Sequence, residues 1–153
     1  MKQKLQLGIA FSIMLGFLAG NCLAQTATAS QYQMAFSLEQ QGKYAEAEIA
    51  WHNFLKDQPN SAEAYAHLGF LEARQGHYRQ AVPSYRHALA LDPKMPGLQM
   101  NLGLAYFKGD ELKEAVQTFS SLLKEQTAAS PETERLTILI GMAHYGLGEL
   151  AAA

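Results

Sequence analysis

A period of about 34 residues runs through most of this chain and constrains its fold more than any other feature. Gly42, Tyr44 and Ala47 return one period later as the same three residue types. A fixed period of about 20–50 residues is typical of a stacked repeat protein, in which each unit buries its apolar face only against its neighbours. The matching positions are Gly42 and Gly76, Tyr44 and Tyr78, Ala47 and Ala81, Trp51 and Tyr85, Leu55 and Leu89, Pro59 and Pro93, with Ala35, Gly69 and Gly103 as a further set and with Ala115 and Phe119 continuing two of the series.

Within each unit, apolar residues follow the spacing of helices. Leu68 and Leu71, and then Val82, Tyr85 and Leu89, recur at intervals of three and four residues, which places them on one stripe of a helix. The pattern predicts helices near residues 30–41, 44–57, 62–75, 78–91, 97–108, 111–126 and 132–146.

Small residues indicate where helix backbones meet and where the chain turns. Gly69 has no side chain, so a neighbouring helix can approach its backbone closely. Gly42 and Gly76 can adopt positive φ and are expected to end the first helix of a pair. In the third unit Gly109 precedes Ala115 by six residues instead of five, which predicts a turn shifted by one position.

Two sites have the composition of helix starts. Asn60 followed by Glu63 resembles a capping box, in which two side chains satisfy free backbone groups at the start of a helix. Ser130 followed by Pro131 also suits a start, because proline is tolerated in the first helical turn.

These landmarks resemble those of the tetratricopeptide repeat, a helix-turn-helix unit of the same period with small, aromatic and proline residues at set positions. The unit at residues 62–95 matches best, although Glu72 stands where the family has an aromatic residue. The resemblance implies an all-α fold, a right-handed superhelical solenoid of helix-turn-helix repeats. It assigns a repeat domain to residues 30–153, with units at about 28–61, 62–95 and 96–129 and a partial unit at 134–153.

The resemblance also implies a site, because the first helices of such pairs line a concave groove. Transferred to this chain, it places an apolar set of first-helix residues on the groove and two cations at its edge. The family's carboxylate clamp of lysines and asparagines is not matched, so an amphipathic helix or an extended apolar peptide fits the groove better. The opposing interpretation is that the chain's own linker, or residues outside this chain, cover the groove. The candidate residues are Tyr32, Phe36, Phe70, Met100, Leu104 and Phe107, with Arg74 and Lys108 at the edge.

Nothing in the sequence points to catalysis, a metal or a cofactor. No two histidines are three or four residues apart, the spacing that a helical metal site favours. No nucleophile elbow or phosphate loop is present. The formal net charge of −2 comes without a long basic run, which argues against nucleic acid as a partner. The aromatic landmarks Tyr44, Trp51, Tyr78, Tyr85 and Phe119 are expected to pack in the core.

The first two dozen residues have the pattern of a secretory signal peptide. Lys2 and Lys4 precede an almost wholly apolar run at residues 5–19, and small residues follow. We expect cleavage after Ala24, then a flexible linker at 25–29 and a secreted or periplasmic mature chain. Two alternatives remain open: an uncleaved membrane anchor, or lipidation of Cys22, which lies one position from the register of a lipoprotein box.

The combined prediction is an exported, non-catalytic scaffold or adaptor that binds a peptide or helix of a partner protein in its groove. The alternative is the helical arm of a larger exported enzyme or assembly machine. The sequence stops early in the second helix of the partial fourth unit. The helix near 132–146 should therefore expose apolar surface and favour self-association.

Overall fold

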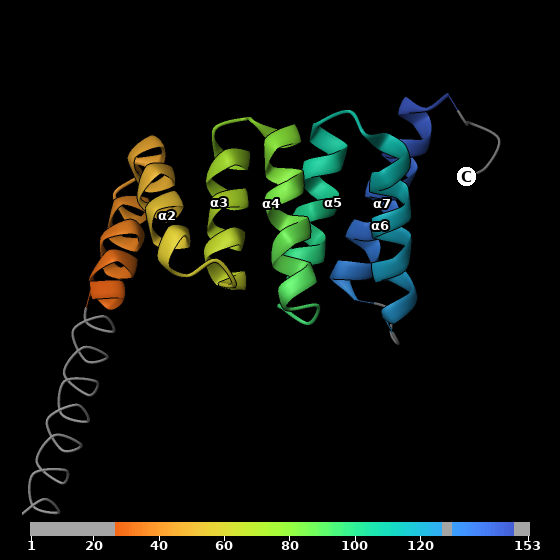
Figure 1. The fold of residues 1–153 in the computed structure, drawn as a ribbon. Helices are drawn as coiled ribbons and strands as arrows, with labels where there is room; N and C mark the ends of the chain where they lie inside the picture. The colour runs from red at the N-terminus through yellow and green to blue at the C-terminus, as the bar shows by residue number, and fades with distance from the viewer. Residues whose placement is uncertain (1–26, 127–129, 149–153) are drawn as a thin grey trace, which may run out of the picture.

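The computed structural model describes residues 27–126 and 130–148, and this part of the chain is a row of helical hairpins (Figure 1). Each helix packs against the next one along the row. The described residues contain no strand, and none of their helices is long and apolar enough to cross a bilayer. The helices comprise residues 27–40, α2 (Tyr44–Asp57), α3 (Ala62–Arg74), α4 (Tyr78–Leu91), α5 (Leu98–Lys108), α6 (Leu112–Glu125) and α7 (Pro131–Gly146). The all-α repeat fold predicted from the sequence period is confirmed.

The turns inside the hairpins keep the period without a shift. Gly42 and Gly76 have φ of 73° and 83°, as predicted. In the third hairpin the left-handed residue is Asp110, with φ of 66°, whereas Gly109 has φ of −80°. The predicted shift is therefore wrong. Aspartate tolerates the left-handed conformation better than most residues with a side chain, so the turn stays one full period after Gly76.

The predicted helix starts are right at one site and displaced at the other. Ser130 accepts a hydrogen bond from the Thr133 amide at 3.2 Å, and Pro131 occupies the first turn of α7. At α3 the cap is Ser61, whose hydroxyl accepts from the Ala64 amide at 3.2 Å, and not Asn60. Asn60 lies in the turn that precedes this cap.

The core consists of two clusters. The first is centred on Trp51 and Leu68 and the second on Tyr85 and Phe119. Gly69 permits the close packing of α3 on α4, because a Cβ there would lie 2.6 Å from a ring carbon of Tyr85. That distance is well below the ~3.5–4.0 Å of an ordinary carbon contact.

Two aromatic landmarks depart from the expected core role. Trp51, Tyr85 and Phe119 are buried, but Tyr44 and Tyr78 are only half-buried. Both lie just after the intra-repeat turns, at the first residues of α2 and α4, where their rings reach the edge of the molecule.

The ends of the chain differ from the sequence prediction or lie outside the description. The pattern assigns residues 25–29 to a flexible linker, but residues 27–29, the part of it that the structure describes, are helical. Alanine and threonine there are compatible with a helix, and the first helix begins further upstream than its apolar stripe indicates. The predicted signal peptide and cleavage site, and the last residues of the partial fourth unit, fall outside the described residues.

Candidate partner-binding groove

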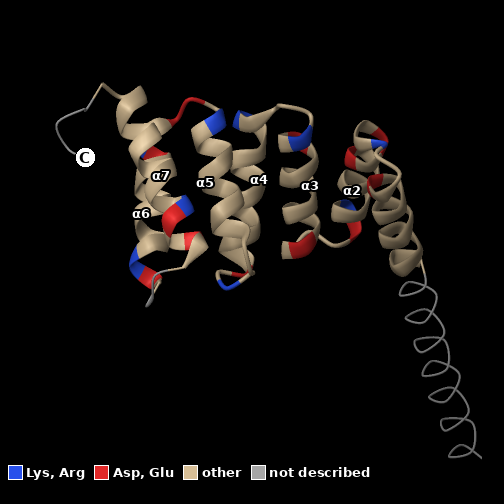
Figure 2. Ribbon diagram, turned by 180° about the vertical axis from the view of Figure 1, so that it is seen from behind, with Lys and Arg blue, Asp and Glu red and all other residues tan. Residues whose placement is uncertain are grey.

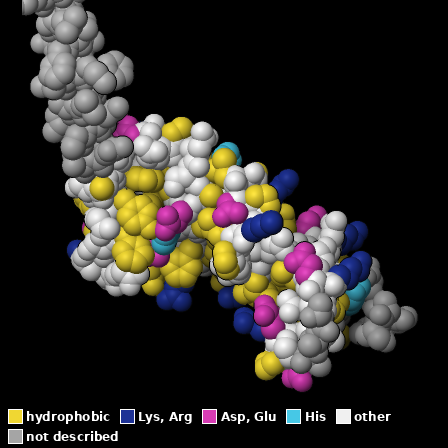
Figure 3. All heavy atoms as spheres, turned by 90° about the horizontal axis from the view of Figure 1, so that it is seen from below, with side chains coloured by type: hydrophobic (Ala, Val, Ile, Leu, Met, Phe, Trp, Pro, Cys, Tyr) yellow, Lys and Arg dark blue, Asp and Glu magenta, His cyan; other side chains and the backbone are white. Residues whose placement is uncertain are grey.

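An apolar column runs along the first helices of the repeats. Phe36, Phe70, Leu104 and Ile138 stand one period apart, on the helix at 27–40 and on α3, α5 and α7. Phe36 and Phe70 expose 37% and 38% of their surface, and Ile138 exposes 62%. Large side chains of this kind have no packing reason to face water, so we call this set the apolar column and treat it as the floor of the groove. Seen from below, exposed hydrophobic side chains gather over the N-terminal half, with acidic side chains and a histidine among them (Figure 3).

Four of the predicted groove residues line one hollow. Phe70 and Arg74 of α3 face Leu104 and Lys108 of α5 across a space of about 150 Å³. The Arg74 guanidinium lies over the Phe70 ring, with its carbon 6.0 Å from the ring centroid. This hollow, here called the basic hollow, therefore combines apolar walls with two positive charges.

A second hollow lies on the other side of Phe70. Its volume is about 300 Å³, and its walls include Glu39, Glu63 and His67. His67 Nδ1 lies 2.8 Å from a carboxylate oxygen of Glu39. The Trp51 indole donates to the same oxygen at 3.3 Å, so the Glu39 carboxylate joins three helices. We call this space the acidic hollow.

The predicted residues Tyr32 and Phe36 continue the groove toward the N-terminal end. Their rings stack with centroids 6.2 Å apart, and Phe36 also meets the edge of His67 at 5.9 Å. The Tyr32 hydroxyl donates to a carboxylate oxygen of Glu63 at 2.5 Å. Burial raises the pKa of Tyr32 to about 12, and this hydrogen bond adds to the effect. Tyr32 therefore remains a neutral donor throughout the physiological range.

The other two predicted residues lie away from these hollows. Met100 lines a separate space of about 460 Å³ near the turn between α4 and α5, together with Pro93 and Leu122. Phe107 is partly buried and packs against the second core cluster. Matching positions in successive first helices therefore predict on which face of the helix a residue lies, but not how deeply its side chain is buried.

Sequence reasoning missed four residues of this surface. Ile138 could have been found, because it stands one period after Leu104. Asn101 lines both hollows beside Phe70, and a polar residue in a first helix has no sequence signal of its own. The sequence predicts Tyr44 and Tyr78 in the core because they are repeat landmarks, so it does not predict their contacts with Arg74 and Lys108.

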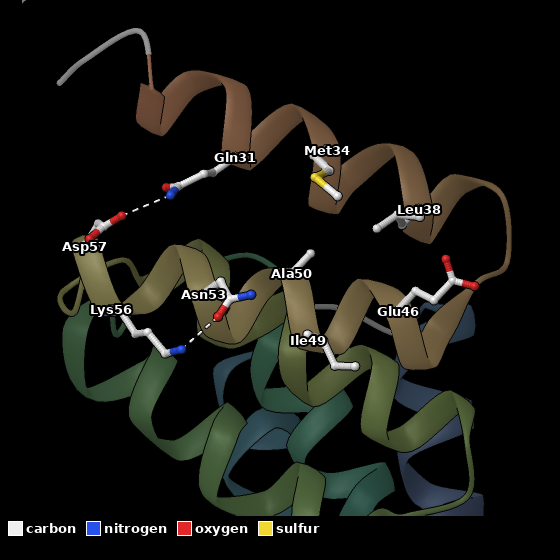
Figure 4. A pocket seen from close by; sticks show the side chains of 9 residues that line it. All are labelled: Gln31, Met34, Leu38, Glu46, Ile49, Ala50, Asn53, Lys56 and Asp57. Atoms are coloured by element: carbon white, nitrogen blue, oxygen red, sulfur yellow. Dashed lines mark hydrogen bonds between the residues drawn. The ribbon is translucent and has the colours of Figure 1, made fainter. Parts of the chain in front are cut away.

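A larger hollow, about 630 Å³, lies between the helix at 27–40 and α2 (Figure 4). Met34 and Leu38 form part of its floor. The residues one period later, Leu68 and Glu72, are buried. In the second repeat this face is covered by the repeat before it. The hollow is therefore the equivalent, in the first described repeat, of a face that packing between repeats buries in the second, and it needs no ligand to explain it.

The groove has no group of metal ligands. Within the described residues, no three histidine, cysteine, aspartate or glutamate side chains are grouped closely enough to hold a metal ion.

Family models for the tetratricopeptide repeat match this chain at residues 29–61 and 68–132. The chain contains tetratricopeptide repeats. Phe36, Phe70 and Leu104 of the apolar column lie within the matched residues, on first helices of the hairpins.

Known proteins with similar repeats include one curated relative. The chain is 30% identical over 86 residues to the Photosystem I assembly protein Ycf3 of Synechococcus sp. (strain CC9605). The match covers 54% of this chain and 50% of that protein, so the chain spans about half the length of this relative.

Solved structures share the fold at low identity. The Yersinia enterocolitica type III secretion chaperone SycD, in complex with a peptide of the translocator YopD, aligns with a TM-score of 0.64 at 23% identity, over 76% of this chain and 91% of that one. PcrH of Pseudomonas aeruginosa, in complex with the chaperone-binding region of PopD, aligns with a TM-score of 0.65 at 19% identity, over 79% and 93%. At these identities the likeness establishes the fold alone.

Proposed function

We propose that this chain is an exported scaffold that holds a segment of a partner protein in its groove and catalyses no reaction. The observation that carries the proposal is the apolar column, three of whose four members, Phe36, Phe70 and Ile138, are exposed large hydrophobic side chains on first helices. An exposed apolar surface of this kind marks a site where a partner buries its own apolar side chains.

The similar proteins support a binding role. SycD and PcrH were each solved with a bound partner segment, and Ycf3 is an assembly protein. By analogy, the open groove of this chain would receive a segment from another protein. The proposal of export rests on the pattern of residues 1–24, and localisation to the periplasm or outside the cell follows from that pattern.

The absence of catalysis is proposed from the character of the groove. Its titratable groups are tied to structural partners: Glu39 to Trp51 and His67, and Glu63 to Tyr32. A general base must be free to reach a substrate proton, and an activated nucleophile needs an adjacent base. His67 pairs with Glu39, but no serine, threonine or cysteine lines either of the two hollows that flank Phe70.

The test replaces the floor of the groove. In the double variant Phe70→Glu, Leu104→Glu, two carboxylates enter the apolar column, and apolar partner segments should no longer bind. Both side chains are partly exposed, so helicity measured by circular dichroism should change little. Binding is measured by capture from an extract of the exported fraction, followed by mapping of the captured segment in the identified partner.

Ile49→Glu provides the matched control. Ile49 is an exposed apolar residue of α2 that lines the hollow between the helix at 27–40 and α2, and not the groove. We expect the control to capture the same partner as the wild-type chain. Equal capture by the double variant and the wild-type chain would remove the groove from the mechanism.

A further inference from the structure

The two cations of the basic hollow have no acidic partner. Neither Arg74 nor Lys108 lies in an ion pair with any carboxylate of the described residues. The Arg74 guanidinium donates to the Tyr44 hydroxyl at 3.0 Å and lies 5.5 Å from that ring's centroid. Lys108 Nζ lies 5.4 Å from the centroid of the Tyr78 ring. The aromatic rings hold both cations in place and leave most of their N–H donors available.

The acidic side of the groove is already engaged. Glu39 accepts from Trp51 and pairs with His67, and Glu63 accepts from Tyr32. Both carboxylates are therefore engaged by donors of the protein itself, whereas Arg74 and Lys108 contact no carboxylate of the described residues. An incoming ligand therefore meets an uncompensated positive charge on one side of Phe70 only.

More positive charge lies at the same end of the helices. Arg79, at the start of α4, donates to the Gly109 carbonyl at 3.1 Å, next to Lys108. Lysine and arginine gather at this end of α3, α4 and α5 (Figure 2). Asp110 and Glu111 lie in the adjacent turn, but neither forms an ion pair with these cations in the described part of the chain. We call Arg74, Arg79 and Lys108 the positive edge, and these three side chains remain available to an anion.

The size of the basic hollow limits what enters it. A space of about 150 Å³ has room for roughly one benzene-sized group, which corresponds to a single apolar side chain and not to the face of a helix. The apolar column continues past this hollow in both directions, to Phe36 and to Ile138. A ligand that follows the column therefore passes through the basic hollow and does not end there.

We infer that the groove takes an extended internal segment of a partner protein, with an apolar side chain between Phe70 and Leu104 and an Asp or Glu beside it that binds Arg74 and Lys108. This inference rests on the proposed function and adds the chemistry of the ligand. The groove helices α3 and α5 touch each other, and touching helices lie ~8–10 Å apart. A chain extended in the polyproline II conformation advances ~3.1 Å per residue and returns to the same face at every third residue, so successive apolar anchors should be about three residues apart.

The experiment selects ligands without assuming a partner. Random dodecapeptides, displayed between fixed flanking residues so that none has a free end, are selected on the full-length chain. Binders that also bind the Phe70→Glu, Leu104→Glu variant are removed. We expect the remaining peptides to be enriched in apolar residues about three positions apart, with Asp or Glu next to one of them.

The selected peptides are then made with each acidic residue changed to its amide. Exposed ion pairs contribute modestly, so each amide should weaken binding about two- to fivefold, and added salt should reduce the difference. In Arg74→Gln, Lys108→Gln the difference between acid and amide should disappear, whereas Arg74→Lys should keep part of it. Arg86→Gln is the control, since Arg86 is an exposed cation of α4 that lines neither hollow beside Phe70.

The possible outcomes separate the inference from the function on which it rests. Groove-dependent peptides without acidic enrichment, or enriched in lysine and arginine, would refute the inference and leave the binding function intact. An acid preference that survives in Arg74→Gln, Lys108→Gln would also refute it. If no peptide depends on Phe70 and Leu104, the proposed function itself fails.

Discussion

Replacing Gly69 by alanine should destabilise the fold, although alanine is the better helix former. The added Cβ would lie 2.6 Å and 2.7 Å from two ring carbons of Tyr85, so it must move about 1 Å to reach ordinary contact. Tyr85 is only 2% exposed and packs in the second core cluster, so its ring cannot swing away. Overpacking of this kind typically costs about 1–3 kcal/mol, against a gain of ~1 kcal/mol from helix propensity. We expect a net loss of up to about 2 kcal/mol.

Gly141→Ala is the matched control with the opposite sign. Gly141 also lies inside a helix, but a Cβ there meets no atom within 4 Å. This variant should gain ~0.5–1 kcal/mol from propensity alone. Urea unfolding of both variants, followed by circular dichroism, measures the difference. Replacing Tyr85 by leucine should recover part of the loss in the Gly69 variant, because the ring atoms in conflict are then removed. Equal stability of the two alanine variants would refute the close contact between α3 and α4.

Three further predictions concern other parts of the molecule. Burial raises the pKa of Glu72 to about 7 from 4.5, so the folded chain holds a proton that the unfolded chain releases. Its stability should fall by up to about 3 kcal/mol as the pH rises from 4.5 to 7, and Glu72→Gln should remove this fall in unfolding measured across that range. Mass spectrometry of the exported chain should show a start at residue 25. An intact Met1 on a membrane-bound product would contradict cleavage, and a lipid on Cys22 would favour the lipoprotein alternative. The exposed Met142 and Tyr145 of α7 should cause association at high concentration, detected by light scattering and reduced in Met142→Glu. A strictly monomeric wild-type chain would overturn this last expectation.

The fold could be predicted from the sequence because several independent signals agree. The repeat period, the helical stripes and the positive-φ glycines all predict the same hairpins. The errors arose where one residue type was given too much weight. A glycine at position 109 suggested a shifted turn, but Asp110 adopts φ of 66° and keeps the register. At α3 the sequence pattern favours Asn60 as the cap, but the adjacent Ser61 accepts the capping hydrogen bond.

The site was less predictable, because helix periodicity sets the face of a residue and not its depth. Phe70 and Phe107 both lie on first helices, but Phe70 lines the groove, whereas Phe107 packs against the core. The difference depends on neighbouring helices that are distant in sequence. Asn101 shows the same limit, since its place between the two hollows follows only from the packing of α3 beside α5.

The repeat landmarks stabilise the fold, and the groove residues are those proposed to contact a partner. Tyr44 and Tyr78 belong to both groups. Buried landmarks such as Trp51 cannot vary without a loss of packing, whereas exposed first-helix positions can vary with little loss of stability. Position 74 and position 108 occupy the same place in successive units and are both cations. Each cation also lies over the tyrosine at a single position of the repeat, so one landmark supports two equivalent contacts. The position of each cation is therefore fixed by a tyrosine that belongs to the repeat pattern. Both contacts join adjacent hairpins, so the positive edge should persist in any conformation that keeps these hairpins packed together, before and after a partner binds.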